Sequence, residues 1–449
     1  MYIINRFRGA RGLKFGAFVL GLIGAFWWTT TANKNLMTIH VDNYNTETNK
    51  HIRDDCACSN ITRKIAANTS GSHPTTSLTK STKQNTEKTI STHITGYAKL
   101  KKLVETNKNI YKHDLQRKQF NEPYELKLKS VFSKTEYDKC SQVISESGLR
   151  HDVQYFVFQY NYNPSPIDVT LLSHLTLERG IHRIEKILAQ WPGPASLSVF
   201  GTDDEIQNFL NTTHSWKRNN IGIHVVYQRN ATYYPVNFMR NVAIYGANTS
   251  HIWMIDADFT PNKDAYQLIK KYIFRFDWTG TKRPALITPA FETALNEGGV
   301  PDNRTQLLKK LEDNSTLVTF SFTRCPNCHI NTNWEQFMIA TEEYKVKGGG
   351  NFEPYLVLQR NNSPIYDERL IARHWNKILY DYELFVLHYE FNVLPDVFIV
   401  HEPHERIKQP KVEFMCLEKI GRLIKDELNK KRIFLQQSIA THRQVHKAH

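Results

Sequence analysis

Asp256 and Asp258 are the side chains of this sequence best suited to hold a metal ion. They directly follow the apolar run at residues 252–255 (IWMI), so we expect both at the carboxyl end of a buried strand. Two carboxylates at i and i+2 can turn toward one ligand there, and hard divalent cations bind carboxylate oxygens while keeping positions open for phosphate. The competing interpretation is a solvated acidic turn that only ends the strand.

The segments around this acidic pair alternate between strands and helices. Strands are expected at residues 168–173, 196–200, 221–227, 251–255 and 285–288. Helices are expected at residues 177–190, 203–210, 235–247 and 262–274. This alternation predicts an α/β fold with a largely parallel sheet and flanking helices. Ligands of such sheets bind outside the carboxyl ends of the strands, which is where the acidic pair would lie.

The N-terminal residues predict the cellular compartment. Residues 15–28 (FGAFVLGLIGAFWW) are uniformly apolar, and basic residues precede them. The uncharged segment 15–32 is close to the length that crosses ~30 Å of hydrocarbon as a helix, and the flanking charge predicts a cytosolic N-terminus. We therefore expect a cytoplasmic tail at 1–14 and a signal-anchor helix at 15–32, with everything after it in the lumen. A cleaved signal peptide is the alternative.

The remainder of the chain divides by composition. Residues 33–120 are rich in Asn, Thr, Ser and Lys and poor in large apolar side chains, which predicts a disordered stem. A folded domain is expected at 121–435 and a basic tail at 436–449. Asn-x-Ser/Thr sequons, the acceptors of N-glycosylation, agree with a lumenal chain. They are Asn60, Asn68, Asn211, Asn230, Asn248, Asn303, Asn314 and Asn361.

The net charge of +14 raises the question of nucleic-acid binding. Much of this charge lies before the apolar segment, in the polar stretch after it, and in the last 30 residues. No nucleic-acid-binding motif accompanies it, so we expect no nucleic-acid partner. The basic surface would be solvated, or it would attract anionic ligands.

Several ordered segments carry a family resemblance. Residues 234–243 (YPVNFMRNVA), followed by the Asp-Ala-Asp, resemble glycosyltransferase family 49, which includes the second catalytic domain of LARGE-type enzymes and the β-1,4-glucuronyltransferase of O-mannose glycan synthesis. Further matches are residues 168–171, 191–194, 289–292, 332–334, 352–355, 366–369, 375–377 and 393–401. The resemblance spans about residues 165–410. It implies a Rossmann-like GT-A fold, a UDP-sugar donor and inversion at the anomeric carbon.

The resemblance also implies a metal site. Asp256 and Asp258 would bind Mn²⁺ (or Mg²⁺) and the donor, with Asp258 as the direct ligand. His401 matches the C-terminal histidine that completes the metal site in many such folds, although a buried structural histidine is the alternative. His404, three residues further on, is a weaker candidate.

Donor contacts are implied at two other places. Asp168 and Thr170, on the first strand, would lie near the uracil. Arg240 and Asn241, on the helix before the acidic strand, would meet the phosphate or the sugar of the donor. Pairing with Asp256 to orient it is an equally supported role for them.

Inversion by a single displacement needs a base on the opposite face of the sugar to deprotonate the acceptor hydroxyl. Asp367 is the first choice, and Glu368 and Glu353 are the alternatives. Each of the three could instead be a carboxylate at the start of a helix, where the helix dipole favours negative charge.

Two features bear on how closely the family pattern applies. Residues 372–374 (ARH) stand where the family usually has glycines, and this change reduces backbone freedom on the side expected to receive the acceptor. Cys325 and Cys328 are expected to form a disulfide rather than a zinc site, because a second ligand pair at zinc-finger spacing is missing from the sequence.

The resulting prediction is an enzyme: a metal-dependent inverting glycosyltransferase that moves a sugar, glucuronic acid in the first instance, from a UDP-sugar to a glycan or glycoprotein acceptor. It would be a single-pass type II protein of the Golgi membrane with a lumenal catalytic domain. The alternatives are a β-1,3-N-acetylglucosaminyltransferase of the same fold and a non-catalytic glycan-binding relative. The sequence leaves a homodimer open.

Overall fold

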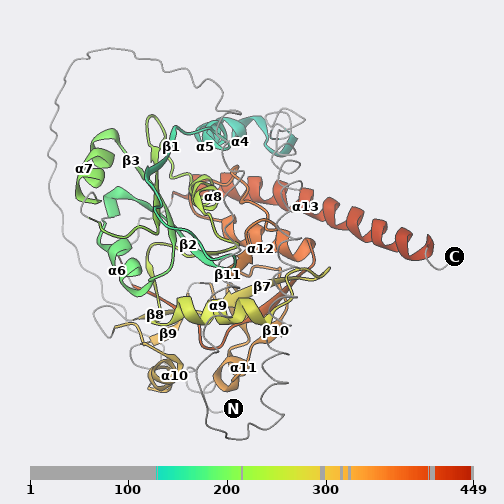
Figure 1. Cartoon of the computed structure of the whole chain (residues 1–449). Coiled ribbons are helices and arrows are strands. Elements are labelled where there is room, and N and C mark those ends of the chain that lie inside the picture. Colours follow the sequence, from blue (N-terminus) through green and yellow to red (C-terminus); the bar gives the residue numbers. More distant parts are fainter. Residues whose placement is uncertain are drawn as a thin grey trace, which may run out of the picture. The chain divides into compact units, whose positions relative to one another are not determined.

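The computed structural model describes residues 128–445, apart from residues 129, 180, 214–215, 294–298, 314–316, 322–324, 403 and 405–409 (Figure 1). The expected tail at 1–14, anchor at 15–32 and stem at 33–120 lie outside the described residues. Three sequons, at Asn60, Asn68 and Asn314, lie outside them as well. Within the described part, no helix combines the length and the apolar character needed to cross a bilayer.

A nine-stranded sheet in the order β1-β4-β3-β2-β5-β11-β7-β12-β10 forms the centre of the domain. Its strands are β1 (Val153–Phe158), β2 (Val169–Thr176), β3 (Ala195–Gly201), β4 (Ile221–Tyr227), β5 (His251–Met254), β7 (Arg283–Thr288), β10 (Tyr344–Val346), β11 (Tyr355–Gln359) and β12 (Tyr389–Val393). The neighbours β4-β3-β2-β5 are parallel and follow the 3-2-1-4 order of a Rossmann fold. The predicted α/β, Rossmann-like fold class is confirmed.

The sheet is mixed because β11 runs antiparallel to both β5 and β7, and both edge strands are also antiparallel to their neighbours. Strand β2 lies between two parallel neighbours and is buried over nearly its whole length. Such a strand has no solvent face, so its sequence runs on without the polar alternation of an exposed strand.

Helices cover both faces of this sheet. They are α6 (His182–Gln190), α7 (Asp203–Thr213), α8 (Val236–Gly246), α9 (Ala265–Arg275), α10 (Arg304–Glu312), α11 (Trp334–Ile339) and α12 (Asn376–Val386). On one face Leu171 and Trp253 pack with the apolar sides of α6, α7 and α9. On the other face Leu172 and Ile252 pack with α8 and α12. Alternate residues of each central strand therefore enter different layers of the core.

A second, four-stranded sheet lies beside the acidic pair, in the order β6-β13-β8-β9. Its strands are β6 (Phe259–Pro261), β13 (Ile399–His401), β8 (Ala290–Thr293) and β9 (Leu317–Thr319). Strand β6 begins one residue after Asp258 and pairs antiparallel with β13, with Phe259 opposite His401. This pairing brings a histidine from the end of the domain next to the acidic pair.

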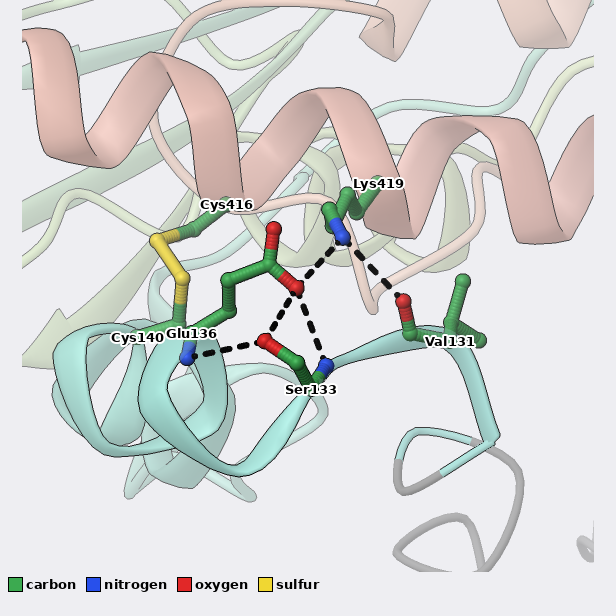
Figure 2. Close-up of a disulfide and its surroundings, with 6 residues drawn as sticks. All are labelled: Val131, Ser133, Glu136, Cys140, Cys416 and Lys419. Atoms are coloured by element: carbon green, nitrogen blue, oxygen red, sulfur yellow. Dashed lines mark hydrogen bonds and ion pairs between the residues drawn. A yellow bond between two sulfur atoms is a disulfide. The ribbon is translucent and has the colours of Figure 1, made fainter.

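The long helix α13 (Lys411–Val445) is joined to the N-terminal helices α4 (Lys134–Lys139) and α5 (Ser141–Glu146). The disulfide Cys140–Cys416 links them, and Lys419 Nζ donates to Glu136 Oε2 at 2.8 Å beside it (Figure 2). Residues 436–445, expected as part of a basic tail, continue this helix. The sequence did not predict α13, whose docking depends on residues more than 270 positions away.

Candidate active site

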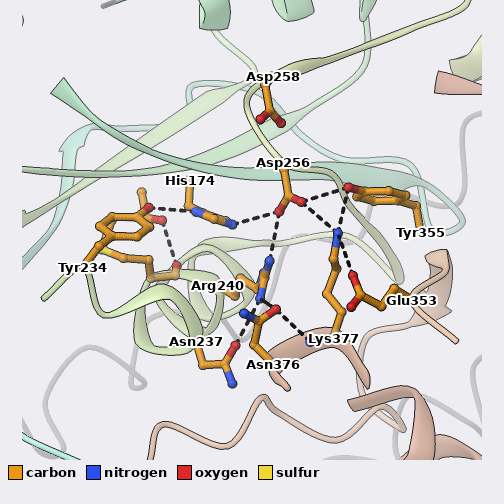
Figure 3. A network of polar contacts seen from close by, with 12 residues as sticks. His174, Tyr234, Asn237, Arg240, Asp256, Asp258, Glu353, Tyr355, Asn376 and Lys377 are labelled. Atoms are coloured by element: carbon orange, nitrogen blue, oxygen red, sulfur yellow. Dashed lines mark hydrogen bonds and ion pairs between the residues drawn. The ribbon is translucent and has the colours of Figure 1, made fainter. Parts of the chain in front are cut away.

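The carboxylate of Asp256 lies at the carboxyl end of β5 and is bound on both oxygens (Figure 3). Its Oδ1 accepts from Arg240 Nη2 at 2.9 Å and lies 3.2 Å from His174 Nε2. Its Oδ2 accepts from the Tyr355 hydroxyl at 2.9 Å and from Lys377 Nζ at 3.0 Å. Burial alone would raise the pKa of Asp256, but the charges of Lys377 and Arg240 hold it well below its usual value. Asp256 is therefore an ionised carboxylate, and protein side chains occupy both of its oxygens.

Asp258 has different partners. Its Oδ2 lies 3.1 Å from His404 Nε2 and 3.4 Å from His401 Nε2. Asp258, His401 and His404 each have a potential ligand atom, and these three atoms lie within 4.8 Å of one another. Burial tends to raise the pKa of Asp258, while hydrogen bonds from His401 and His404 lower it further than burial raises it.

These three side chains fit a divalent cation. Asp258 Oδ1 and His401 Nδ1 are buried and lack a hydrogen-bond partner among the described residues. A buried polar atom without a partner is costly unless a ligand occupies it. One carboxylate with two imidazoles is a donor set that transition metals accept, and the carboxylate suits Mn²⁺. The structure thus brings the expected Asp258 and His401 together and adds His404, whereas Asp256 stands outside this cluster.

The buried polar face of α8 connects Asp256 to the segment that holds the carboxylates expected as bases. Arg240 Nη1 donates to Asn237 Oδ1 at 3.1 Å and to Asn376 Oδ1 at 3.0 Å, so its second nitrogen remains directed at Asp256. Asn241 does not reach Asp256. Instead its side chain donates to Glu368 Oε1 at 2.7 Å and bonds both backbone groups of Tyr366. Of the two roles open to Arg240, the structure supports orientation of Asp256.

Asp367, the first choice for the base, is the counter-ion of a buried arginine. It accepts from Arg369 Nε at 2.9 Å and Nη2 at 2.7 Å, and Arg369 also pairs with Glu427. A carboxylate in a two-point contact with guanidinium is a poor proton acceptor, because protonation would leave the arginine charge less compensated. The contact with Arg369 argues against Asp367 as the base and supports a role in holding the turn.

Glu353 is the carboxylate that joins the Asp256 network. Its Oε2 lies 3.9 Å from Lys377 Nζ, which binds Asp256 (Figure 3). Its backbone N–H donates to the carbonyl of Cys328 at 2.8 Å, and Cys325–Cys328 is a disulfide, as the sequence predicted. Glu353 lies on the loop just before β11, whose first residue, Tyr355, binds Asp256. Glu353 is thus the one of the three proposed bases that stands beside the Asp256 network.

Asp168 and Thr170 lie at the end of β2 that is away from the acidic pair. They stand at the amino end of β2, where Val169 pairs with His251 at the start of β5. Asp168 Oδ1 accepts from the Tyr266 hydroxyl at 2.8 Å, and Thr170 is fully buried. Asp168 and His174 are six positions apart, about 20 Å at the rise of a β-strand. This placement, at the end of β2 away from the acidic pair, argues against uracil contacts from Asp168 and Thr170, which stay a prediction.

Three residues of the site were missed. His174 lies at the carboxyl end of β2, just beyond the strand end that the sequence analysis expected, and its Nδ1 lies 2.7 Å from the Tyr234 hydroxyl. The rule that ligands bind at carboxyl ends of parallel strands would have found it. Tyr355 and Lys377 stand inside the motif segments that carried the family resemblance, but nothing local distinguishes them from structural residues.

The sequons within the described residues differ in exposure. Asn211, Asn230, Asn248 and Asn303 are exposed, as an N-glycan requires, while Asn361 is half-buried. Asn303 also caps α10 by accepting from the Gln306 backbone N–H at 3.1 Å.

Comparison with known proteins agrees with the motif analysis. Residues 215–431 match the family 49 model described as glycosyl-transferase for dystroglycan, which confirms the expected resemblance. The xylosyl- and glucuronyltransferases LARGE2s of Danio rerio and LARGE1 of Homo sapiens are each 36% identical over 275 residues, 60% of this chain and 36% of theirs. The chain thus spans about a third of the length of these relatives. A solved structure of GalNAc-T7 with UDP, GalNAc and Mn²⁺ shares 12% identity at a TM-score of 0.37, covering 59% of this chain and 48% of that one.

Proposed function

We propose that this chain, with its family 49 region, is a metal-dependent inverting glycosyltransferase that uses a UDP-sugar. The observation that carries the proposal is the pairing of a metal-type cluster, Asp258 with His401 and His404, with a neighbouring Asp256 that two cations already neutralise. A solvated acidic turn would need neither the histidines nor the buried Arg240. The names of the relatives include glucuronyl transfer, which supports UDP-glucuronic acid as the donor.

The residues divide the work by charge. Asp258, His401 and His404 would hold the cation, which when bound stabilises negative charge on the diphosphate of the donor. Arg240 and Lys377 are the two cations that balance Asp256 and Glu353 in a largely buried position. The positive charge that an anionic donor meets would therefore come from the bound cation.

Glu353 is the proposed base. During transfer the acceptor oxygen bonds to the anomeric carbon while the bond from that carbon to the UDP oxygen breaks, and the electron pair leaves with UDP. The hydroxyl proton passes to the base carboxylate. Glu353 Oε2 lies 3.9 Å from Lys377 Nζ, beside the Asp256 network, which places this carboxylate at the site.

The function can be tested with purified full-length protein. A panel of UDP-glucuronic acid, UDP-xylose and UDP-N-acetylglucosamine would be assayed for hydrolysis with and without Mn²⁺. Asp258→Asn should abolish metal-dependent UDP binding, whereas Asp264→Asn, an exposed carboxylate nearby, should leave it unchanged. Failure of the parent to bind UDP with metal, alongside retained glycan binding, would favour the non-catalytic alternative.

The base assignment has its own test. Glu353→Gln should lower kcat at least 100-fold while leaving UDP affinity within a few fold, the pattern of a lost general base. Asp367→Asn should instead lower stability, because it removes one counter-ion of a buried arginine. The reverse result would restore Asp367 as the base.

The proposed location is the Golgi membrane, as a type II protein with this domain in the lumen and a glycan or glycoprotein acceptor. Two disulfides, Cys140–Cys416 and Cys325–Cys328, support an oxidising compartment. Four exposed sequons support it further. Resistance of the expressed protein to peptide N-glycosidase, or labelling of the domain from the cytosol, would contradict this location.

A further inference from the structure

The turn at residues 372–375 has an unusual backbone. Ala372, His374 and Trp375 have φ values of 55°, 106° and 64°, in the region that favours glycine. Side chains with a Cβ are strained there, and His374 lies beyond even the usual left-handed range. Such strain persists only where surrounding contacts hold the backbone in place. The backbone N–H of Ala372 donates to the Tyr234 carbonyl at 2.9 Å, while the side chains of His374 and Trp375 are held by helix α13.

Glu418 on α13 binds two side chains of the turn through one oxygen. Its Oε2 accepts from Trp375 Nε1 at 2.7 Å and lies 2.7 Å from His374 Nε2. Its Oε1 accepts from Arg422 Nε at 2.8 Å. Burial acts to raise the pKa of Glu418, but the hydrogen bonds from His374, Trp375 and Arg422 hold it at about 2. The helix therefore presents an ionised acceptor to the strained turn.

The surface of α13 is also shaped for this turn. A Cβ on Gly421 would stand 2.5 Å from Cγ of Trp375, so the indole packs where only glycine leaves room. The ring of Phe414 lies 4.1 Å from that of His374, centroid to centroid. The helix itself is anchored by the Cys140–Cys416 disulfide (Figure 2). Cys416 precedes Glu418 by two residues.

The turn leads directly into the site. Trp375 is the N-cap of α12, and the next two residues reach the acidic pair. Asn376 Oδ1 accepts from Arg240 at 3.0 Å, and Lys377 Nζ donates to Asp256 at 3.0 Å. Because the backbone at Trp375 sets the direction of the first turn of α12, a change at 372–375 moves both contacts.

We propose that Glu418 is a positioning residue that holds the strained turn 372–375, and through it Asn376 and Lys377, against Arg240 and Asp256. Glu418 acts through His374 and Trp375, the two side chains of the turn that it binds. Its effect on catalysis rests on the proposed function, while its effect on the turn does not. The strain of three non-glycine residues makes the turn dependent on α13.

The test uses full-length variants and two measurements. Hydrogen exchange would follow the amides of 370–378, and kcat/KM would be measured for metal-dependent UDP-sugar hydrolysis. Glu418→Ala should speed exchange across this segment at least tenfold and lower kcat/KM 10- to 100-fold, because misplacement of site residues by about 1 Å costs up to about 100-fold. Asp426→Ala, an exposed acidic residue of the same helix, is the control and should change neither.

Two further variants separate positioning from general damage. Glu418→Gln keeps an acceptor oxygen for the two rings and should stay within threefold of the parent. Glycines at 372 and 374, added to Glu418→Ala, remove most of the strain and should return kcat/KM to within fivefold of the parent. The proposal is overturned if Glu418→Ala exchanges like Asp426→Ala, or if the glycines rescue nothing. An inactive parent would refute the proposed function, and the exchange measurement would still decide the role of Glu418.

Discussion

Asp256 and Asp258 should respond oppositely to the same substitution by asparagine. Asp256→Asn removes the charge that compensates Arg240 and Lys377, whose side chains are only 3% and 13% exposed. Asp258→Asn does not remove the counter-ion of Arg240 or Lys377. It also keeps one side-chain oxygen for His401 and His404. The first change should therefore lower stability, and the second should abolish the metal response.

The magnitudes follow from burial. Removing one partner of a buried ion pair costs about 3–5 kcal/mol. Because Asp256 is 22% exposed, we expect the lower end, about 3 kcal/mol, which corresponds to about 6 °C in Tm for a domain of this size. Asp258→Asn should stay within about 1 kcal/mol of the parent. A ligand at 100 times its Kd stabilises by about 2.7 kcal/mol, so Mn²⁺ with UDP should raise the Tm of the parent by about 5 °C.

Thermal unfolding of the three proteins, each with and without Mn²⁺ and UDP, measures both effects. Asp256→Asn should begin lower and still gain stability from the ligands. Asp258→Asn should begin near the parent and gain nothing. Equal baselines for the two variants, or a full ligand shift in Asp258→Asn, would refute the division into a charge-compensating Asp256 and a metal-binding Asp258.

Three other predictions concern the fold. Burial raises the pKa of Asp381 to about 8, so stability from this group is present below about pH 4 and falls by up to about 1.4 kcal/mol per pH unit toward pH 8. Asp381→Asn should flatten that slope in urea unfolding from pH 5 to 8, and an unchanged slope would contradict it. Serines at Cys140 and Cys416, which close a loop of 276 residues, should cost about 3–5 kcal/mol in denaturant unfolding, and no change in midpoint would argue against the disulfide. Gly246→Ala would place a Cβ 1.9 Å from a buried histidine ring and should cost about 1–3 kcal/mol, whereas Gly299→Ala, with open space around it, should be neutral in the same assay.

Much of the secondary structure around the site was predictable because it depends on residues that are close together in the sequence. The apolar run before Asp256 forms a strand, as continuous apolar sequences do in buried sheets. The acidic pair follows the carboxyl end of this strand, which is where ligands of such sheets bind. Strand and helix alternation predicted the α/β class for the same reason. The cysteine pair at 325 and 328 is close enough in the chain to predict its own disulfide.

The site assignments that the structure argues against depend on contacts between distant parts of the chain. Asp168 begins the same strand that His174 ends, and a strand pattern has no mark that distinguishes the two positions by role. Asp367 was predicted to be the base, but its carboxylate pairs with Arg369, whose surroundings include α12 and α13.

By itself, the sequence determined that this chain has an α/β domain with an acidic pair at a strand end and a family 49 pattern around it. Only the tertiary structure showed that Asp256 pairs with the side chains of Arg240 and Lys377, while Asp258 faces His401 and His404. The partners of these two carboxylates come from positions 121 and 146 residues away, respectively. Periodicity and local motifs report only neighbours along the chain, whereas strand register and helix docking determine which distant side chains meet.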